Sequence, residues 1–426
     1  MKHITLFVAL FMACCCYAQE KYSAYPSDFG THLVMKGKTV DVPITVTNAG
    51  TKDITSIVYV LTSEGEADVQ KQVKLSTPIK SGKSSQITLT FNASSEACKS
   101  IKTFTISRVN TLTNKSGQKT ATGNIITLEE KPVVTPLVEE FTGTWCGWCP
   151  VGFDGMERAH EEFGKRAVLI AIHHGDVMQA EEFQHLVNRV GGFPSAIIDR
   201  KENDFYPAAS ELKTQINNEI KERVAAGTIE VNASWTSKAK TAIKISTKTQ
   251  FVYSDDNANY AIGYALTEDG MKGSGSDWAQ NNNLSHNPSY KNIEFWYNGP
   301  SKVTGVEFNH VGVAAWGLED GIDGSVSPTF HKDEELSYSY TANISGKKLI
   351  QNKNKLNVIA LLINRTTGAI VNVAETSTID DYTTGIEDIE NSTKPAENAI
   401  YDLAGRKVQK APKGIYIING KKVAVN

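Results

Sequence analysis

The sequence has few cysteines, and half of them lie at its very beginning. Six cysteines occur in 426 residues, and three of these fall within the first 16, which leaves Cys98, Cys146 and Cys149. An exported chain that depends on disulfides for stability carries more cysteines, in even number. The remaining cysteines are therefore interpreted as chemical rather than architectural, and Cys98 as a buried or free thiol rather than an intermolecular bridge.

Charge and long apolar runs are also scarce. The formal net charge is -3 and the lysines are scattered, so no positive surface is expected to attract nucleic acid. No stretch beyond the N-terminus approaches the roughly 20 apolar residues that a membrane-spanning helix requires, so no transmembrane helix is predicted. No Ser-His-Asp order, phosphate-binding loop or paired-carboxylate pattern stands out, and no cofactor is predicted.

The first residues have the pattern of a secretory signal peptide. Lys2 precedes an apolar run over residues 4–16, and the small residue Ala18 comes before a polar start. Residues 1–18 are predicted to be removed after transport across the inner membrane. A lipoprotein anchored through Cys14 is the alternative.

Hydrophobic periodicity divides the rest into a multidomain α+β chain. Residues 22–130 contain alternating apolar positions typical of strands, as in "KTVDVPITVTNAG", and predict an immunoglobulin-like β-sandwich. Residues 133–226 alternate strand and helix, which predicts an α/β domain. Residues 228–378 return to strands and predict a jelly-roll-like β-sandwich. Polar residues 379–398 predict a linker, and residues 399–426 a small β-rich unit.

The stretch "EFTGTWCGWCP" (residues 140–150) carries the strongest chemical signal. Cys146 and Cys149 are three residues apart at the start of a predicted helix, close enough to form a disulfide. Cys146 is expected at the helix N-terminus, where backbone N–H groups and the helix dipole favour a thiolate nucleophile. Cys149, one turn into the helix, is expected to be shielded and to resolve the mixed disulfide, while Trp148 either contacts substrate or covers the disulfide.

A zinc site is the alternative use of such a motif. Zinc requires four ligands, but the sequence has no second CxxC and no HxxxH. His173 and His174 are adjacent on a predicted strand, so their side chains point to opposite faces. No metal site is predicted.

Together with the later "GGFPS", the motif resembles thioredoxin-like domains over about 95 residues. The resemblance implies that Pro194 is a cis-proline beside the disulfide and that the backbone of Phe193 pairs with substrate. It also implies that Trp145 contacts substrate and that Glu140 is a buried acid able to relay a proton to and from Cys149. The sequence departs from thioredoxin in having Gly-Trp rather than Gly-Pro between its cysteines, which leaves the redox potential and the direction of the reaction open.

The chain is also similar, over residues 130–378, to a family of Bacteroidetes outer-membrane proteins. Its last residues, with "YDLAGRKV" and "KGIYIINGKKVAV", resemble the C-terminal sorting domain of type IX secretion cargo. This implies passage through the periplasm to the cell surface, the outer membrane or the extracellular space.

Two functions follow as hypotheses. The first is an exported or surface thiol-disulfide oxidoreductase or isomerase that acts on protein thiols and disulfides. The second is a surface adhesion or glycan-binding protein with a non-catalytic scaffold, in which Trp278, Trp296, Tyr297 and Trp316 form an aromatic platform, although such rings are commonly core or loop anchors.

Overall fold

Strands dominate the molecule. They make up 45% of the structure and helices 14%. The computed structural model describes residues 20–63, 65–201, 203–382, 400–403, 406–408, 410–418 and 421–425. The chain divides into two compact units, Met1–Asp380 and Asp381–Asn426. The predicted signal peptide and most of the predicted linker lie outside the described residues.

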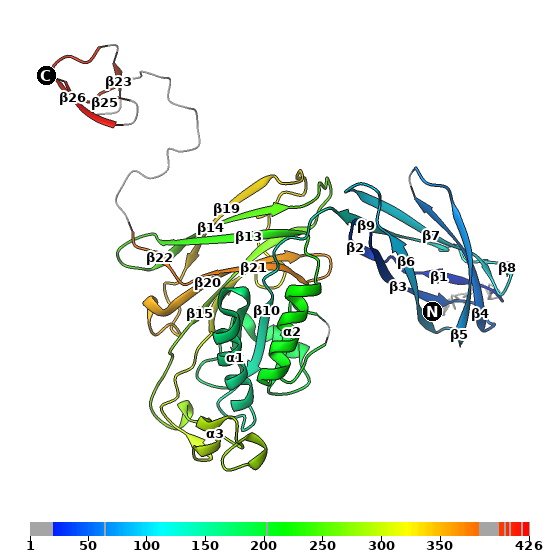
Figure 1. The fold of residues 1–426 in the computed structure, drawn as a ribbon, viewed down its shortest axis with the longest axis horizontal. Helices are drawn as coiled ribbons and strands as arrows, with labels where there is room; N and C mark the ends of the chain where they lie inside the picture. Colours follow the sequence, from blue (N-terminus) through cyan, green and yellow to red (C-terminus); the bar gives the residue numbers. More distant parts are fainter. Residues whose placement is uncertain are drawn as a thin grey trace, which may run out of the picture. The chain divides into compact units, whose positions relative to one another are not determined.

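Alternating apolar residues build the first segment into a β-sandwich (Figure 1). In β3, Val42, Ile44 and Val46 are fully buried while the residues between them face outward. Their side chains join those of the second sheet in one hydrophobic core. The sheets are β1 (Ala24–Pro26), β3 (Thr39–Asn48) and β6 (Ser84–Asn92), and then β2 (Gly30–Met35), β9 (Thr120–Leu128), β7 (Lys99–Val109), β4 (Ile54–Ser63) and β5 (Val69–Ile79), with β8 (Leu112–Thr113) beside β7.

The next segment joins strands from distant parts of the sequence into one mixed sheet of seven strands. In spatial order they are β12 (Ser195–Ile198), β10 (Leu137–Thr142), β11 (Val168–His173), β18 (Val311–Trp316), β15 (Tyr260–Glu268), β20 (Leu356–Asn364) and β21 (Ile370–Thr376). β10, β11 and β18 run parallel, and the other neighbours are antiparallel.

This sheet overturns the predicted fold class. A central α/β thioredoxin-like domain between two separate sandwiches was predicted, and that prediction was wrong. The structure is nearly all β, with few helices. The three strands of residues 133–226 are continued by four strands from residues 228–378, because Ala171 of β11 pairs with Val311 of β18. Local periodicity predicts that a segment is a strand, but it does not indicate which other strand pairs with it.

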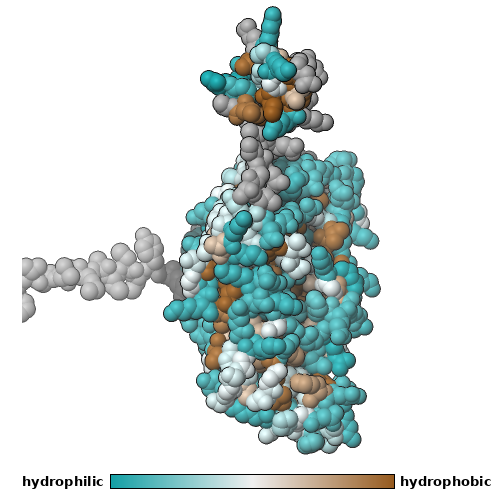
Figure 2. Space-filling model, turned by 90° about the vertical axis from the view of Figure 1, so that its left-hand side faces the viewer, coloured by the Kyte–Doolittle hydropathy of each residue, from teal (hydrophilic) through white to brown (hydrophobic). Residues whose placement is uncertain are grey.

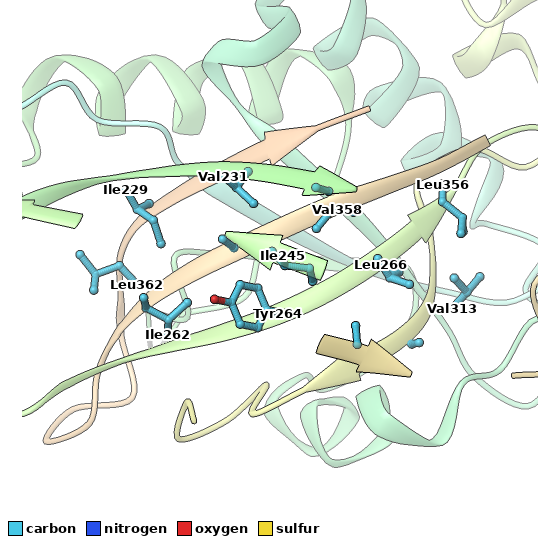
Figure 3. Close-up of a cluster of buried hydrophobic side chains, with 14 of the residues drawn as sticks. Ile229, Val231, Ile245, Ile262, Tyr264, Leu266, Val313, Leu356, Val358 and Leu362 are labelled. Atoms are coloured by element: carbon cyan, nitrogen blue, oxygen red, sulfur yellow. The ribbon is translucent and has the colours of Figure 1, made fainter. Parts of the chain in front are cut away.

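A second sheet packs against one face of the seven-stranded sheet. It consists of β19 (Glu335–Asn343), β14 (Ala242–Phe251), β13 (Gly227–Trp235) and β22 (Ile379–Asp380). Figure 3 shows apolar side chains of β13, β14, β15, β18 and β20 pointing into the space between the two sheets. Tyr264 is buried there, and its hydroxyl lies 3.1 Å from Thr247 Oγ1. The largest core of the chain lies in this space.

Two helices cover the β10–β12 end of the large sheet. α1 (Pro150–Phe163) and α2 (Ala209–Glu222) bury Met156, Phe163, Leu212 and Ile216 against these strands. The 3₁₀ helices η1 (Gly164–Arg166) and η2 (Glu181–Arg189) connect further strands, and η2 buries Phe183. The sheet, α1 and η2 together position the loops that carry the cysteines and the prolyl loop.

A long insertion between β15 and β18 makes the remaining small elements. They are η3 (Ser276–Trp278), β16 (Gln280–Asn281), η4 (Pro288–Tyr290), α3 (Glu294–Asn298) and β17 (Lys302–Val303); η5 (Lys353–Lys355) precedes β20.

The second unit is a small four-stranded sheet. Its strands are β24 (Lys407–Val408), β23 (Ile400–Tyr401), β25 (Gly414–Ile418) and β26 (Lys421–Val425), all antiparallel. Leu403 and Ile415 are exposed.

On the face of the molecule shown in Figure 2, hydrophobic residues are interspersed with hydrophilic ones. Among the described residues, the helices are all too short or too polar to cross a membrane.

Candidate functional site

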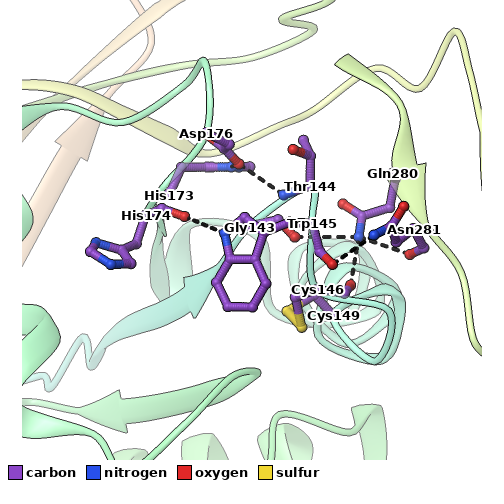
Figure 4. The surroundings of a disulfide bond; sticks show 10 residues. All are labelled: Gly143, Thr144, Trp145, Cys146, Cys149, His173, His174, Asp176, Gln280 and Asn281. Carbon is purple, nitrogen blue, oxygen red and sulfur yellow. Dashed lines mark hydrogen bonds and ion pairs between the residues drawn. A yellow bond between two sulfur atoms is a disulfide. The ribbon is translucent and has the colours of Figure 1, made fainter. Parts of the chain in front are cut away.

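The two cysteines lie in the loop between β10 and α1 and form a disulfide (Figure 4). Their Cα atoms are 5.4 Å apart. Cys146 is 5% exposed and Cys149 is 1% exposed, whereas the flanking Trp145 and Trp148 are 48% and 42% exposed. A partner therefore meets the two indole rings before it meets sulfur.

The helix starts later than the sequence indicated. α1 begins at Pro150, with Cys149 as its N-cap, so Cys146 lies in the turn that precedes the helix. A proline at the first helical position lacks only an N–H that would have no partner there, which explains this start. The positive end of the helix dipole is thus nearest to Cys149, and it acts on Cys146 from further away than expected.

The prolyl loop lies beside the cysteine loop. The Phe193–Pro194 peptide bond is cis. The ring of Phe193 lies 5.6 Å from that of Trp145 and stacks on His174 at 5.8 Å. Trp145 is fixed in turn, because its indole N–H donates to the carbonyl of His174 at 2.7 Å. The structure thus places Phe193, whose peptide bond to Pro194 is cis, against Trp145, the residue that precedes Cys146.

The insertion between β15 and β18 holds the cysteine loop from the opposite side. The buried side chain of Gln280 donates to the carbonyl of Cys146 at 2.8 Å, and Asn281 donates through its amide to Trp145 O at 2.8 Å. The backbone N–H of Asn283 donates to Gly147 O at 2.8 Å. Three consecutive carbonyls of the motif, those of Trp145, Cys146 and Gly147, thereby accept hydrogen bonds from residues more than 130 positions away.

Removing the carboxamide of Gln280 tests this bracing. Gln280→Ala is expected to lower the free energy of unfolding by about 1–3 kcal/mol, because the buried carbonyl of Cys146 loses its shorter hydrogen bond and keeps only the one from the Cys149 N–H at 3.3 Å. Urea unfolding followed by circular dichroism measures the change. Asn287→Ala, a replacement elsewhere in the insertion, serves as the control and should cost about 0.5–1 kcal/mol, the lower part of the usual range, because its cap hydrogen bond is exposed. Equal stabilities for Gln280→Ala and wild type would contradict the bracing.

Glu140 lies on β10 below the start of α1 and is fully buried. Burial raises the pKa of its carboxyl to about 8, against a smaller opposing effect of the hydrogen bond with Thr142. Its Oε1 has no hydrogen-bond partner. A Cβ at Gly152 would lie 2.4 Å from this oxygen, so a glycine is needed for α1 to approach. The carboxyl is therefore protonated at neutral pH and able to exchange a proton.

A cavity of about 20 Å³ connects Glu140 with Cys149. Its lining also includes His173, Gln280 and His310. A space of this size holds one water molecule. A second, open cavity of about 630 Å³ lies beside Trp145, between the loop after β11 and the insertion.

The four aromatic residues of the glycan-binding alternative differ in exposure: Trp278, Tyr297 and Trp316 are half-buried, whereas Trp296 is buried. Trp296 is 2% exposed and packs edge-on against Phe153 at 5.4 Å. Trp278 covers Gly273, and Trp316 lies 6.2 Å from Tyr340. Trp296 is a core anchor and is not available to a ligand.

The remaining features are the third cysteine, Cys98, and the possible metal ligands. Cys98 is a free and exposed thiol, and it lies far from the motif in the sequence. In the part of the chain that the structure describes, no three His, Cys, Asp or Glu side chains gather as metal ligands would.

Sequence reasoning placed one of His173 and His174 at the strand end near the site, but it missed Gln280, Asn281 and Asp176. The first two have no local signal, because they come from an insertion that no motif marks. Asp176 follows the buried strand that ends at His173, in "HHGD", and polar residues at such a strand end were a usable signal.

Known proteins resemble this chain only weakly. No family model and no curated protein matches the chain. HBP35 of Porphyromonas gingivalis, a Bacteroidetes protein, is 14% identical over 69% of this chain and 98% of its own, with a TM-score of 0.42. A protein from Agrobacterium tumefaciens is 13% identical over 61% of this chain and 99% of its own, with a TM-score of 0.32. The CARDB domain of a Pyrococcus furiosus protein, in complex with di-metal ions, is 15% identical over 26% of this chain and 97% of its own, with a TM-score of 0.22. At these similarities none of the three proteins indicates the function of this chain.

Proposed function

We propose that the chain is a thiol-disulfide oxidoreductase or isomerase that acts on protein substrates through Cys146 and Cys149. The observation that carries the proposal is the disulfide between exposed indole rings, with the prolyl loop on one side and the water-sized cavity beneath it. A purely structural disulfide needs neither a partly exposed aromatic rim nor a buried acid next to one of its sulfurs.

The two cysteines take different roles. Cys146 lies next to the exposed Trp145, where a substrate disulfide can approach, so it is the attacking thiol. Cys149 lines the cavity with Glu140 and is the resolving thiol. Trp145, Trp148 and Phe193 form the rim that contacts the substrate chain.

We further infer that the chain works outside the cytoplasm. The N-terminal pattern of a signal peptide and the C-terminal resemblance to type IX secretion cargo support transport to the cell surface or the extracellular space. Reducing equivalents are scarce there, so oxidation or isomerisation of substrate disulfides is easier to sustain than net reduction.

Turbidity caused by the reduction of insulin with dithiothreitol tests the function. Wild-type protein is expected to accelerate it, and Cys146→Ser is expected to abolish the acceleration because no attacking sulfur remains. Cys98→Ser, which removes the exposed cysteine outside the site, is the matched control and should keep full activity. Identical rates with wild type and Cys146→Ser would reject the proposal.

A further inference from the structure

His173 and Asp176 form a buried pair at the end of β11. Their side chains are 3% and 2% exposed, and His173 Nδ1 lies 2.8 Å from Asp176 Oδ2. The carboxylate also accepts from the backbone N–H groups of Thr144 and Met178, each at 2.8 Å. Burial opposes ionisation, but these hydrogen bonds outweigh it and lower the pKa of Asp176 below its ordinary value.

This geometry decides which nitrogen of His173 can exchange a proton. An ionised carboxylate only accepts hydrogen bonds, so Nδ1 carries a hydrogen and donates it to Asp176. Nε2 is then the basic atom. The ring is held in place by Phe308, which packs edge-on at 5.6 Å. A carboxylate that fixes an imidazole in this way is the arrangement of general bases in hydrolases.

His173 lines the same water-sized cavity as Cys149. The other titratable groups that face this cavity are Glu140 from β10, Glu157 from α1 and His310 from the segment before β18. Because burial raises the pKa of Glu140 to about 8, that group is protonated at neutral pH and is poorly suited to accept a proton there. Burial lowers the pKa of His310 to about 4, against the opposing charge of Asp269, so this imidazole is neutral.

We propose that His173 takes the proton of the Cys149 thiol, through one water in the cavity, during resolution of the mixed disulfide. This inference rests on the proposed function. The Cys149 thiolate attacks Cys146 Sγ, the Cys146–Cys149 bond forms, and the bond from Cys146 to the substrate sulfur breaks. The substrate leaves as a thiolate and takes a proton from solvent. Two electrons pass from the cysteine pair to the substrate, and His173 later returns its proton to solvent.

Reaction of the reduced protein with dithionitrobenzoate, in a Cys98→Ser background, separates the two half-reactions. Release of the first thionitrobenzoate reports attack by Cys146, and release of the second reports attack by Cys149. His173→Gln is expected to slow the second release on the order of 10²-fold and to remove one ionisation from its pH profile. The first release should keep its wild-type rate.

The controls separate this inference from the function itself. His185→Gln changes a partly exposed histidine that pairs with Glu319 and should leave both releases unchanged. Asp176→Asn keeps the imidazole but removes its ionised acceptor, so it should also slow the second release; it decides the matter if His173→Gln does not fold. A second release with wild-type rate and pH profile in these variants overturns the role of His173. If instead Cys146 reacts no faster than an ordinary thiol, the proposed function fails.

Discussion

Glu140→Gln is expected to be more stable than the wild type at pH 8, by about 4 kcal/mol, and to differ by less than about 1 kcal/mol at pH 5. Burial raises the pKa of this carboxyl from 4.5 to about 8 in the folded chain. Between these pH values the folded protein holds a proton that the unfolded chain has released. The free energy of unfolding therefore falls as the pH rises through this window, and glutamine, which cannot ionise, removes that loss.

Denaturant unfolding at half-unit intervals from pH 5 to pH 8 measures the effect. Burial also raises the pKa values of Asp199 and Glu375 to about 7, so part of the pH dependence remains in the variant. Glu161→Gln, on the exposed face of α1, is the matched control and should follow the wild-type curve. Parallel curves for Glu140→Gln and wild type would show that the carboxyl ionises without cost.

Arg200→Ala is expected to lower the free energy of unfolding by about 3–5 kcal/mol. The guanidinium is fully buried and pairs with Glu139, which is 1% exposed, with Nη2 lying 2.8 Å from Oε1. Arg200 Nη1 also donates to the carbonyl of Leu318, so the side chain ties β10 to the loop after β18. Removing it leaves a buried carboxylate without its counter-charge, and this cost exceeds what the intact pair contributes.

The double variant Glu139→Leu/Arg200→Met makes this prediction specific. Because neither charge remains, it should be more stable than Arg200→Ala, and close to the wild type. Arg158→Ala removes a half-exposed arginine whose pair with Asp154 is on the surface, and it should cost less than about 1 kcal/mol. A loss in the double variant as large as in Arg200→Ala would mean that packing, and not the unpaired charge, sets the cost. Urea unfolding at pH 7 gives all four values.

Local patterns predicted much of the element content. The alternation around Val42 and Ile44 corresponds to β3, and the apolar run before His174 corresponds to β11. These patterns depend only on which face of an element is buried, and that is encoded in the spacing of residues along the chain. The position of α1 was displaced, because the CxxC spacing alone does not distinguish a helical turn from the turn before a helix.

The sequence predicted those residues of the site that lie within one short motif, and it missed Gln280, which comes from a distant segment. Cys146, Cys149 and Trp145 are consecutive or nearly so in the sequence, and Glu140 is six residues before Cys146. Gln280 contacts the same loop from more than 130 residues away. No local spacing encodes such a contact, since it results from how β15 and β18 place the insertion.

The sequence by itself determined the chemistry that is available: two nearby thiols, an acid on the preceding strand, and aromatic residues on either side. Only the tertiary structure decided that Cys146 lies in the turn before the helix, that His173 shares the cavity with Cys149, and that Trp296 is buried. The physical reason is that burial and hydrogen-bond partners depend on neighbours brought in by sheet pairing. The pairing of Ala171 with Val311 joins strands that the sequence had suggested would belong to separate domains.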